Sequence, residues 1–554
     1  MVTDFGFLDY AVFTAYAVLI LGVGLWVSRD KDGQQKNAED YFLASKSLPW
    51  WAIGSSLIAA NISAEQFIGM SGSGFALGLA IASYEWMAAF TLIIVGKYFL
   101  PIFIEKGIYT IPEFVEKRFS TNLKTILAIF WIALYVFVNL TTVLYLGGLA
   151  IETILGVDMI YAIIGLALFS AAYSLYGGLS AVAWTDVIQV VFLVLGGLVT
   201  TYLALNTVSD GAGVWQGLTT IYNAAPDRFV MILDKSNPEY MNLPGIGVLI
   251  GGLWVANIYY WGFNQYIIQR TLAAKSLREA QKGILLAGFL KIIIPLIVVI
   301  PGIAAYVIVN DPAIMARLGA SAMVNLPGVG TADRAYPWLL HFLPAGLKGL
   351  AFAALAAAIV SSLASMLNST STIFTMDIYK QYINKNADDK TTVNVGRISG
   401  AVALLIAVLM APLLGGIDQA FQFIQEYTGL VSPGILGVFL LGLFWKKTTN
   451  KAAIWGALLS VPIALFFKVG PKSWAAGTGI ESFFPSLPWM DQMGYTTLLT
   501  IILIVILSLA QNKGQDDAKG IPLNKEIFKT SPLFNICSFA IILIVAVIYA
   551  LFWK

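Results

Sequence analysis

Long apolar stretches most constrain how this chain of 554 residues can fold. Each runs about 18 to 30 residues, enough for a helix to cross the roughly 30 Å hydrocarbon core of a membrane. The sequence is 58% hydrophobic and only 12% charged, whereas soluble domains are about a quarter charged. Membrane barrels would instead show short alternating segments. The sequence therefore predicts an all-α polytopic membrane protein.

The basic residues predict how these helices cross the membrane. Loops that follow odd-numbered spans hold 24 of the 33 Lys and Arg residues. Because basic loops stay on the cytoplasmic side, both termini are expected on the outer side of a bacterial inner membrane. The fourteen candidate spans begin near residues 8, 49, 79, 124, 158, 181, 244, 280, 346, 395, 427, 450, 494 and 534.

Two spans contain polar runs that an unbroken lipid-facing helix would not tolerate. The second span reads ANISAEQ over residues 60–66, and the seventh reads NIYYWG over residues 257–262. These spans lie five apart, as in an inverted repeat of five plus five helices whose broken helices meet at a central site. Hydrogen bonding between helices through Asn61 and Asn257 is the alternative.

The repeat predicts how the chain is organised. It divides the sequence into an extra N-terminal helix with a cytoplasmic loop (1–48), a first repeat (49–206), an outer cap segment (207–243), a second, inverted repeat (244–446) and three additional C-terminal helices (447–554).

Charged and amide side chains inside the spans are candidates for a substrate site, because polar groups in hydrocarbon are costly. Glu85 lies in the third span, Lys291 in the eighth, and Gln425 at the start of the eleventh. One carboxylate, one ammonium and several amides suit the recognition of hydroxyl groups. A structural ion pair between Glu85 and Lys291 is the alternative. Aromatic residues beside these groups would stack on a sugar ring or simply fill space: Tyr84, Tyr260, Trp261 and Phe421.

A second group of residues suggests a sodium site. Ala358, Ser361 and Ser362 share one face of the ninth span. Backbone carbonyls freed where the second span unwinds, at Ala59 and Ile62, would complete a shell of five uncharged oxygens. Such a shell suits a monovalent hard cation, because a divalent ion would call for carboxylates. The alternative is that these serines bond back to carbonyls within their own helix.

Other classes of function lack the residues they need. The sequence has one cysteine, Cys537, one histidine, His341, and no phosphate-binding loop. No catalytic cluster is visible, so the chain is predicted to be a secondary transporter rather than an enzyme. The expected partners are a solute, sodium and membrane lipid, with no nucleic acid and no obligatory protein partner.

Several long motifs resemble the sodium/solute symporter family, and within it the bacterial sodium/galactose symporters. The motifs are IAANISAEQF at 58–67, YGGLS at 176–180, QRTLAAK at 269–275 and the segment 361–368. The resemblance implies the inverted-repeat fold of the leucine transporter, alternating access, and sodium-coupled uptake of galactose or glucose.

The resemblance also implies roles for individual residues. It implies sugar contacts at Gln66, Glu85, Asn257, Lys291 and Gln425, with Asn61 nearby. The implied inner gate is Tyr260, with Trp261 beside it, and the implied outer gate is Met70, Tyr84 and Phe421. The implied sodium ligands are Ala59, Ile62, Ala358, Ser361 and Ser362, with Asp186 on the ion exit route.

One position departs from the sodium/galactose pattern. Ala88 stands where those symporters have a serine one turn after the glutamate, so one sugar hydrogen bond is expected to be lost. A symporter of the same family for another small polar solute is the alternative: a polyol, an amino acid, a vitamin or sialic acid. An anionic solute would call for an arginine, and the sequence predicts no arginine within a span.

The number of sodium ions follows from the hydroxyl groups near Asp186. A second sodium at this carboxylate would need hydroxyl ligands on the ninth span. Only Ser361 and, one turn later, Ser365 are available there. The sequence therefore predicts one sodium per sugar.

Overall fold

The computed structural model describes residues 5–29, 41–42, 44–108, 110–415, 419–470 and 487–554. In these parts of the chain the regular structure is helical, apart from one isolated β-bridge between Leu48 and Ala274. Ten helical segments are long and apolar enough to cross a membrane, and two sharply bent helix pairs raise the number to twelve. The structure confirms an all-helical polytopic membrane protein.

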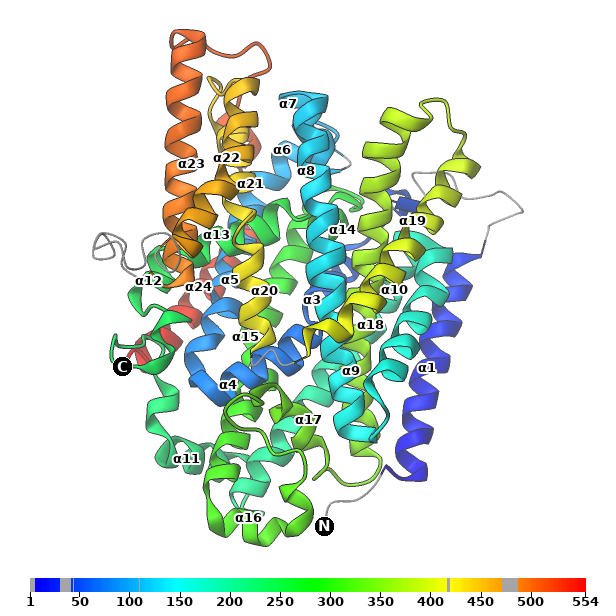
Figure 1. Ribbon diagram of the computed structural model, residues 1–554, viewed down its shortest axis with the longest axis vertical. Coiled ribbons are helices and arrows are strands. Elements are labelled where there is room, and N and C mark those ends of the chain that lie inside the picture. The colour runs from blue at the N-terminus through cyan, green and yellow to red at the C-terminus, as the bar shows by residue number, and fades with distance from the viewer. Residues whose placement is uncertain (1–4, 30–40, 43, 109, 416–418, 471–486) are drawn as a thin grey trace.

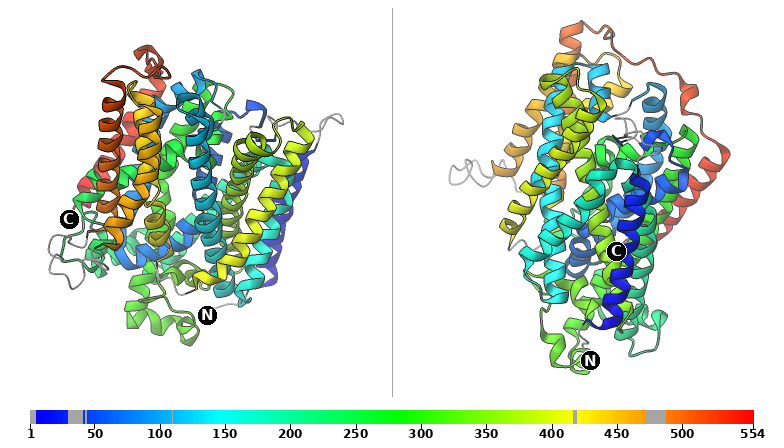
Figure 2. Two further views of the ribbon diagram at one scale, coloured as in Figure 1. Left: turned by 45° about the horizontal axis from the view of Figure 1, so that its top comes forward. Right: turned by 90° about the vertical axis from the view of Figure 1, so that its right-hand side faces the viewer.

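The helices form one bundle, in which the longer ones run in roughly the same direction (Figures 1 and 2). The first part of the chain contains α1 (Phe7–Ser28), α3 (Trp50–Asn61), α4 (Ser71–Leu77), α5 (Ser83–Ile94), α6 (Leu100–Glu105), α7 (Ile111–Arg118), α8 (Thr121–Ala133), α9 (Thr141–Leu155) and α10 (Met159–Val208). The middle part contains α12 (Ile246–Ile250), α13 (Gly252–Ile258), α14 (Gln265–Leu272), α15 (Leu277–Asn310), α18 (Leu347–Ile373) and α19 (Asp389–Met410). The last part contains α20 (Ala420–Thr428), α21 (Ser432–Phe444), α22 (Asn450–Val469), α23 (Trp489–Asn512) and α24 (Pro532–Leu551).

Short π-helical stretches continue several of these helices, and they occur at the predicted site. They span Glu65–Met70, Val95–Phe99, Leu134–Leu140, Tyr259–Phe263 and Phe374–Ile383. A π-helical turn widens the backbone and is often found at functional positions. Two of the five coincide with the polar runs of the second and seventh expected spans.

The count of ten to twelve differs from the predicted fourteen because some expected spans are joined or short. The expected fifth and sixth spans are merged in α10, whose only non-helical backbone angles are at Gly178 (φ 66°). By itself the fifth span gives only a shorter apolar stretch, Met159–Ala172. The end of the second span and the whole third span form one continuous apolar segment, Glu65–Glu105.

Helix α18 occupies the centre of the bundle. In its most apolar window 94% of the residues are buried, against 17% for α1 at the edge. The α18 sequence is rich in Ala and Ser, which allow neighbouring helices to approach closely in a membrane. α1 is tied to the start of α18 by Asp9, whose carboxylate accepts from the backbone N–H groups of Gly346 and Gly349 at 2.7 Å and 2.8 Å.

A cap of short helices covers one end of the bundle (Figure 1). It contains α11 (Val214–Ala224), in the predicted cap segment 207–243, together with α16 (Pro312–Leu318) and α17 (Ala335–Leu340). The C-terminal end of the chain contacts this cap, because the Met231 N–H donates to the carbonyl of Phe552 at 2.8 Å. α1 begins at the same end, beside Gly346. The two ends of the described chain therefore lie on one side of the bundle.

The break at Gly178 gives a prediction for stability. A Cβ at this position would lie 2.3 Å from the carbonyl oxygen of Tyr41, and the positive φ adds strain. Gly178→Ala should therefore lower the stability by more than the roughly 1–3 kcal/mol of strained backbone alone, seen as a lower Tm in detergent. Gly211→Ala is the matched control, because Gly211 also has positive φ but faces open space. Equal losses of Tm in the two variants would contradict the packing argument.

Candidate functional site

The polar run of the second span interrupts its helix. α3 ends at Asn61, and Ile62 leaves helical geometry with ψ 95°. The Ser63 N–H, which would bond Ala59 in a continuous helix, donates instead to Oε1 of Gln66 at 2.9 Å. The Gln66 N–H bonds the carbonyl of Ser63 rather than that of Ile62. The carbonyls of Ala59 and Ile62, which the sequence predicts as sodium ligands, are thus released from their usual helical donors.

The seventh span is interrupted in the same way. α13 ends at Ile258, a π-helical stretch follows over Tyr259–Phe263, and Asn264 is extended (φ −87°, ψ 118°) before α14 begins. Tyr135 donates a hydrogen bond to the side chain of Asn264, which holds the extended residue. Both expected interruptions are therefore present, and they lie on either side of one cavity.

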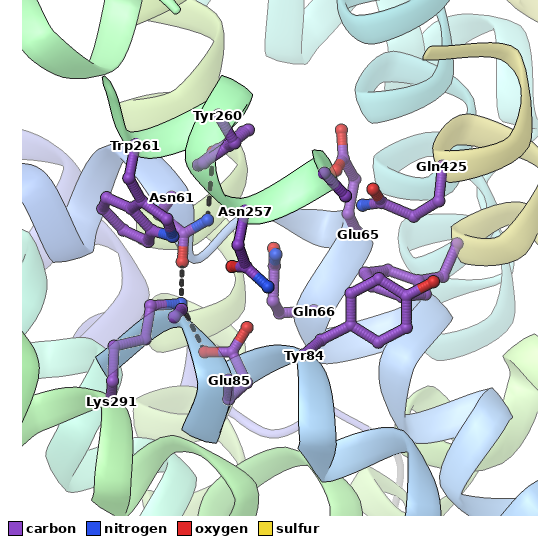
Figure 3. A pocket seen from close by; sticks show the side chains of 13 residues that line it. Asn61, Glu65, Gln66, Tyr84, Glu85, Asn257, Tyr260, Trp261, Lys291 and Gln425 are labelled. Carbon is purple, nitrogen blue, oxygen red and sulfur yellow. Dashed lines mark hydrogen bonds and ion pairs between the residues drawn. The ribbon is translucent and has the colours of Figure 1, made fainter. Parts of the chain in front are cut away.

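The cavity contains ten of the eleven residues predicted as sugar contacts or gates (Figure 3). The second and third spans contribute Asn61, Glu65, Gln66, Tyr84, Glu85 and Ala88, and the later spans contribute Ala256, Asn257, Tyr260, Trp261, Lys291, Phe421 and Gln425. The exception is Met70, which is fully buried in the π-helical stretch but does not line the cavity.

A buried ion pair forms one wall of the cavity. The Lys291 ammonium donates to the Glu85 carboxylate and to the side-chain oxygen of Asn61 (Figure 3). Only 1% of the Lys291 side chain and 4% of the Glu85 side chain are exposed. The ring of Trp261 lies 5.1 Å from the Lys291 nitrogen, within range of a cation–π contact. Removing either charge would leave the other buried without compensation.

Aromatic rings close the cavity on two sides. Tyr84 and Phe421 meet edge to face with their ring centroids 4.9 Å apart, and both are buried. Next to Phe421, the Ala420 N–H donates to the carboxylate of Asp333, in the short helix Ala332–Arg334 before α17, at 2.9 Å. On the other side, the Tyr260 hydroxyl accepts from the Asn61 amide at 3.0 Å. Aromatic side chains predicted as gates therefore border the cavity on two sides.

Two of the predicted sodium ligands, Ser361 and Ser362, lie on α18 and bond to other helices. Ser362 on α18 donates to the carbonyl of Ala60 at 3.1 Å, at the end of α3. Ser362 therefore bonds across to the second span rather than to its own helix, which was the alternative interpretation. Ser361 donates to the carboxylate of Asp186. In the described residues, no cluster of three or more His, Cys, Asp or Glu side chains suits a metal ion, so the sodium site would rely on uncharged oxygens.

Two features of this region differ from the sequence predictions. Arg270 follows the seventh span, whose next loop is predicted to be cytoplasmic, but it lies on α14, fully buried, 3.5 Å from Asp186. The hydroxyl count near Asp186 was also too low, since Ser56 on α3 donates to this carboxylate at 2.5 Å.

Glu65 is a cavity residue to which the sequence analysis gave no role. It is 6% exposed, and one of its carboxylate oxygens has no hydrogen-bond partner. Figure 3 shows it beside Gln425. The sequence does mark Glu65 as a candidate site residue, because it belongs to the same polar run as Gln66. Ser56 and Arg270 had no such signal, because only the packing of α3 and α14 brings them to Asp186.

Comparison with known proteins places this architecture in a family. The model of the "Sodium:solute symporter family" matches residues 41–460. This chain belongs to that family. It is 67% identical over 547 residues to the sodium/glucose cotransporter of Vibrio parahaemolyticus, covering 99% of this chain and 98% of that protein. It is also 35% identical over 480 residues to the human sodium/myo-inositol cotransporter 2, covering 82% of this chain and 69% of that protein. The family predicted from the motifs is confirmed.

A solved structure shares the fold. The substrate-bound, outward-open structure of a Na⁺-coupled sialic acid symporter matches with a TM-score of 0.77, covering 92% of this chain and 98% of that one. The two sequences are 24% identical, so this match supports the fold alone.

The ion pair gives a prediction that separates a solute site from a structural bridge. Glu85→Ala and Lys291→Ala should each abolish concentrative sugar uptake and each lower the Tm, because a lone buried charge costs about 3–5 kcal/mol. The double variant should recover the Tm but not the uptake, because both charges are assigned to the sugar. Uptake in proteoliposomes and Tm in detergent measure the two effects. A double variant that transports like the wild type would make the pair purely structural.

Proposed function

We propose that this chain is a sodium-coupled sugar symporter of the galactose/glucose type that works by alternating access. The observation that supports it most is the cavity, in which one carboxylate–ammonium pair and several amides lie between aromatic side chains predicted as gates. The 67% identity to a sodium/glucose cotransporter supports the same solute class. Membership of the family makes the protein a secondary transporter, and sodium is its transported ion rather than a resident cofactor.

The chemistry of the cavity suits a neutral sugar. Glu85 accepts hydrogen bonds, Lys291 donates them, and the amides of Gln66, Asn257 and Gln425 do both, as sugar hydroxyls require. In this structure Lys291 bonds to both Glu85 and Asn61. A sugar would exchange these bonds for bonds to its hydroxyls, so that no buried polar group is left without a partner.

Sodium would act by joining two spans. The proposed ligands are the carbonyls of Ala59, Ile62 and Ala358 and the hydroxyls of Ser361 and Ser362. The first two belong to the broken second span, which also carries Asn61 and Gln66 to the cavity. Sodium that holds this span in place would order the sugar site, and by linkage each ligand would raise the affinity of the other by the same factor.

We also infer the arrangement in the membrane. We infer fourteen spans with both termini outside, because the basic loops then lie on one side of the membrane. The contacts of the first and last described helices with the cap support the same orientation. The chain would comprise an extra N-terminal helix (1–48), inverted repeats at 49–206 and 244–446 joined by the cap segment 207–243, and three additional helices (447–554). The proposed location is the bacterial inner membrane, and no obligatory protein partner is proposed.

Another small polar solute of the same family is the second candidate. The 35% identity to a sodium/myo-inositol cotransporter favours a polyol among these solutes. Amino acids, vitamins and sialic acid mostly carry a carboxylate. The only arginine found near the site, in the described part of the chain, is Arg270, and it is already paired with Asp186. A neutral polyol therefore remains the main rival to a hexose.

Counterflow in proteoliposomes tests the function. Labelled galactose or glucose should accumulate against an internal pool of the same sugar only when sodium is present, and myo-inositol should compete weakly. Ser362→Ala should raise the sodium concentration for half-maximal uptake, because it removes a proposed ligand. Ser460→Ala is the control, since Ser460 is a buried serine on α22 that bonds within its own helix. Sodium-independent counterflow would refute the proposal.

The same vesicles give the number of ions. With fixed sugar and sodium gradients, the reversal potential should correspond to one sodium per sugar. Each inward positive charge contributes about 2.3 kcal/mol per 100 mV to the driving force. A ratio near two would instead make Asp186, Ser56 and Ser361 a second sodium site.

Ala88 gives a prediction about sugar preference. It lies one turn after Glu85 and lines the cavity. Ala88→Ser should restore a hydroxyl in the sugar site and tighten galactose binding by about 1 kcal/mol, roughly fivefold in Kd. Ala256→Ser is the matched control, because it adds a hydroxyl to another cavity alanine for which no sugar contact is expected. An equal gain in both variants, or none in Ala88→Ser, would contradict a specific contact at position 88.

A further inference from the structure

Arg270 is a fully buried cation that neither the sugar site nor the sodium shell requires. Its guanidinium donates to the hydroxyl of Ser56 at 2.8 Å, to the hydroxyl of Ser365 and to the backbone carbonyl of Tyr266. It also lies 3.5 Å from the carboxylate of Asp186. Four elements therefore meet at one side chain: α3, α10, α14 and α18.

The position of these contacts relates Arg270 to the sodium route. Asp186 accepts from Ser361, a proposed sodium ligand. Ser365 lies one turn further along α18, away from the cap end where the helix begins, and donates to the carbonyl of Ser361 at 2.7 Å. Arg270 thus lies against the cytoplasmic side of the sodium shell, where an ion leaving toward Asp186 would have to pass.

A continuous series of hydrogen bonds links Arg270 to the sugar cavity. Glu85 accepts from Lys291, Lys291 donates to Asn61, and Asn61 donates to Tyr260. Tyr260 accepts from the hydroxyl of Tyr266 at 2.8 Å. The carbonyl of Tyr266 in turn accepts from Arg270 on the same short helix. Movement of α14 would therefore disturb the inner sugar gate and the Asp186 ion pair together.

We propose that Arg270 is a positioning residue that keeps the cytoplasmic sodium route closed by holding Asp186, and that it ties this closure to the Tyr260 gate. The inference rests on the proposed function, since it needs sodium and sugar in the assigned sites. A buried ion pair is weak evidence for stability, because apolar replacements are often equally stable. The contacts that join the pair to both solute routes point to a role in transport.

Leakage of sodium tests the proposal. Proteoliposomes containing the full-length protein are loaded with ²²Na⁺, and its efflux is measured without sugar. Arg270→Gln should raise this efflux about tenfold over the wild type. A tenfold increase corresponds to lowering the free-energy barrier to sodium efflux by about 1.4 kcal/mol. Arg270→Lys should restore part of the closure, because it returns the charge but not the planar group that bonds several partners.

Further variants show whether Arg270 acts through Asp186. Equal sodium efflux is expected from Asp186→Asn, Arg270→Gln and the double variant. Each removes the same contact, so their effects on efflux should not add. The double variant has no unpaired charge, so it serves as the test if a single variant fails to fold. Arg118→Gln is the matched control, because Arg118 is equally buried and is paired with Asp517 far from the cavity. This control should show wild-type efflux.

The outcomes separate the two proposals. Wild-type efflux in the double variant, or equal leakage in Arg118→Gln, would overturn the role of Arg270. Sodium-dependent sugar binding, measured on the same preparations in detergent, reports on the function itself. If the wild type binds sugar without regard to sodium, the proposed function fails. If it binds with sodium and the Arg270 variants do not leak, only the inference about Arg270 fails.

Discussion

Two helices are interrupted inside the membrane, and an interrupted helix leaves backbone groups that hydrocarbon cannot satisfy. At the first break the amide side chain of Gln66 accepts the bond from Ser63 that the backbone would have accepted. At the second, Tyr135 fixes the extended residue Asn264. At the first break the carbonyls of Ala59 and Ile62 lose their usual helical donors, and these are two of the proposed sodium ligands. The cavity and the proposed sodium shell both depend on these side-chain hydrogen bonds, which replace the backbone bonds of a continuous helix.

Polar groups brought together in this way must also satisfy one another while no solute is bound. Lys291 therefore bonds Glu85 and Asn61, and Asn61 bonds Tyr260. The charges of Glu85 and Lys291 are thus paired within the cavity, whereas one carboxylate oxygen of Glu65 has no partner. The cavity can still take up a sugar, because hydroxyls can both donate and accept in place of these bonds.

The residues of the sugar cavity were largely predictable. Glu85, Lys291 and Gln425 stand out in the sequence because charges and amides are costly inside a span, and the broken spans stand out for the same reason. Ten of the eleven predicted sugar and gate residues line the cavity. Met70, at the end of the π-helical stretch Glu65–Met70, is buried but does not line the cavity. Glu65 was overlooked beside Gln66, although it obeys the same rule.

The sequence by itself determined the membrane class, the two breaks, the family and most of the cavity. Polar residues are costly in hydrocarbon, so they stand out within each apolar span without knowledge of the neighbouring helices. The tertiary structure alone decided which residues surround Asp186. Arg270 follows a broken helix, and its position in a basic stretch near Lys275 predicted a loop. Only the packing of α14 against α3 and α18 buries it against Ser56 and Ser365. Contacts among three helices depend on how their backbones pack, and no local pattern in the sequence records that packing.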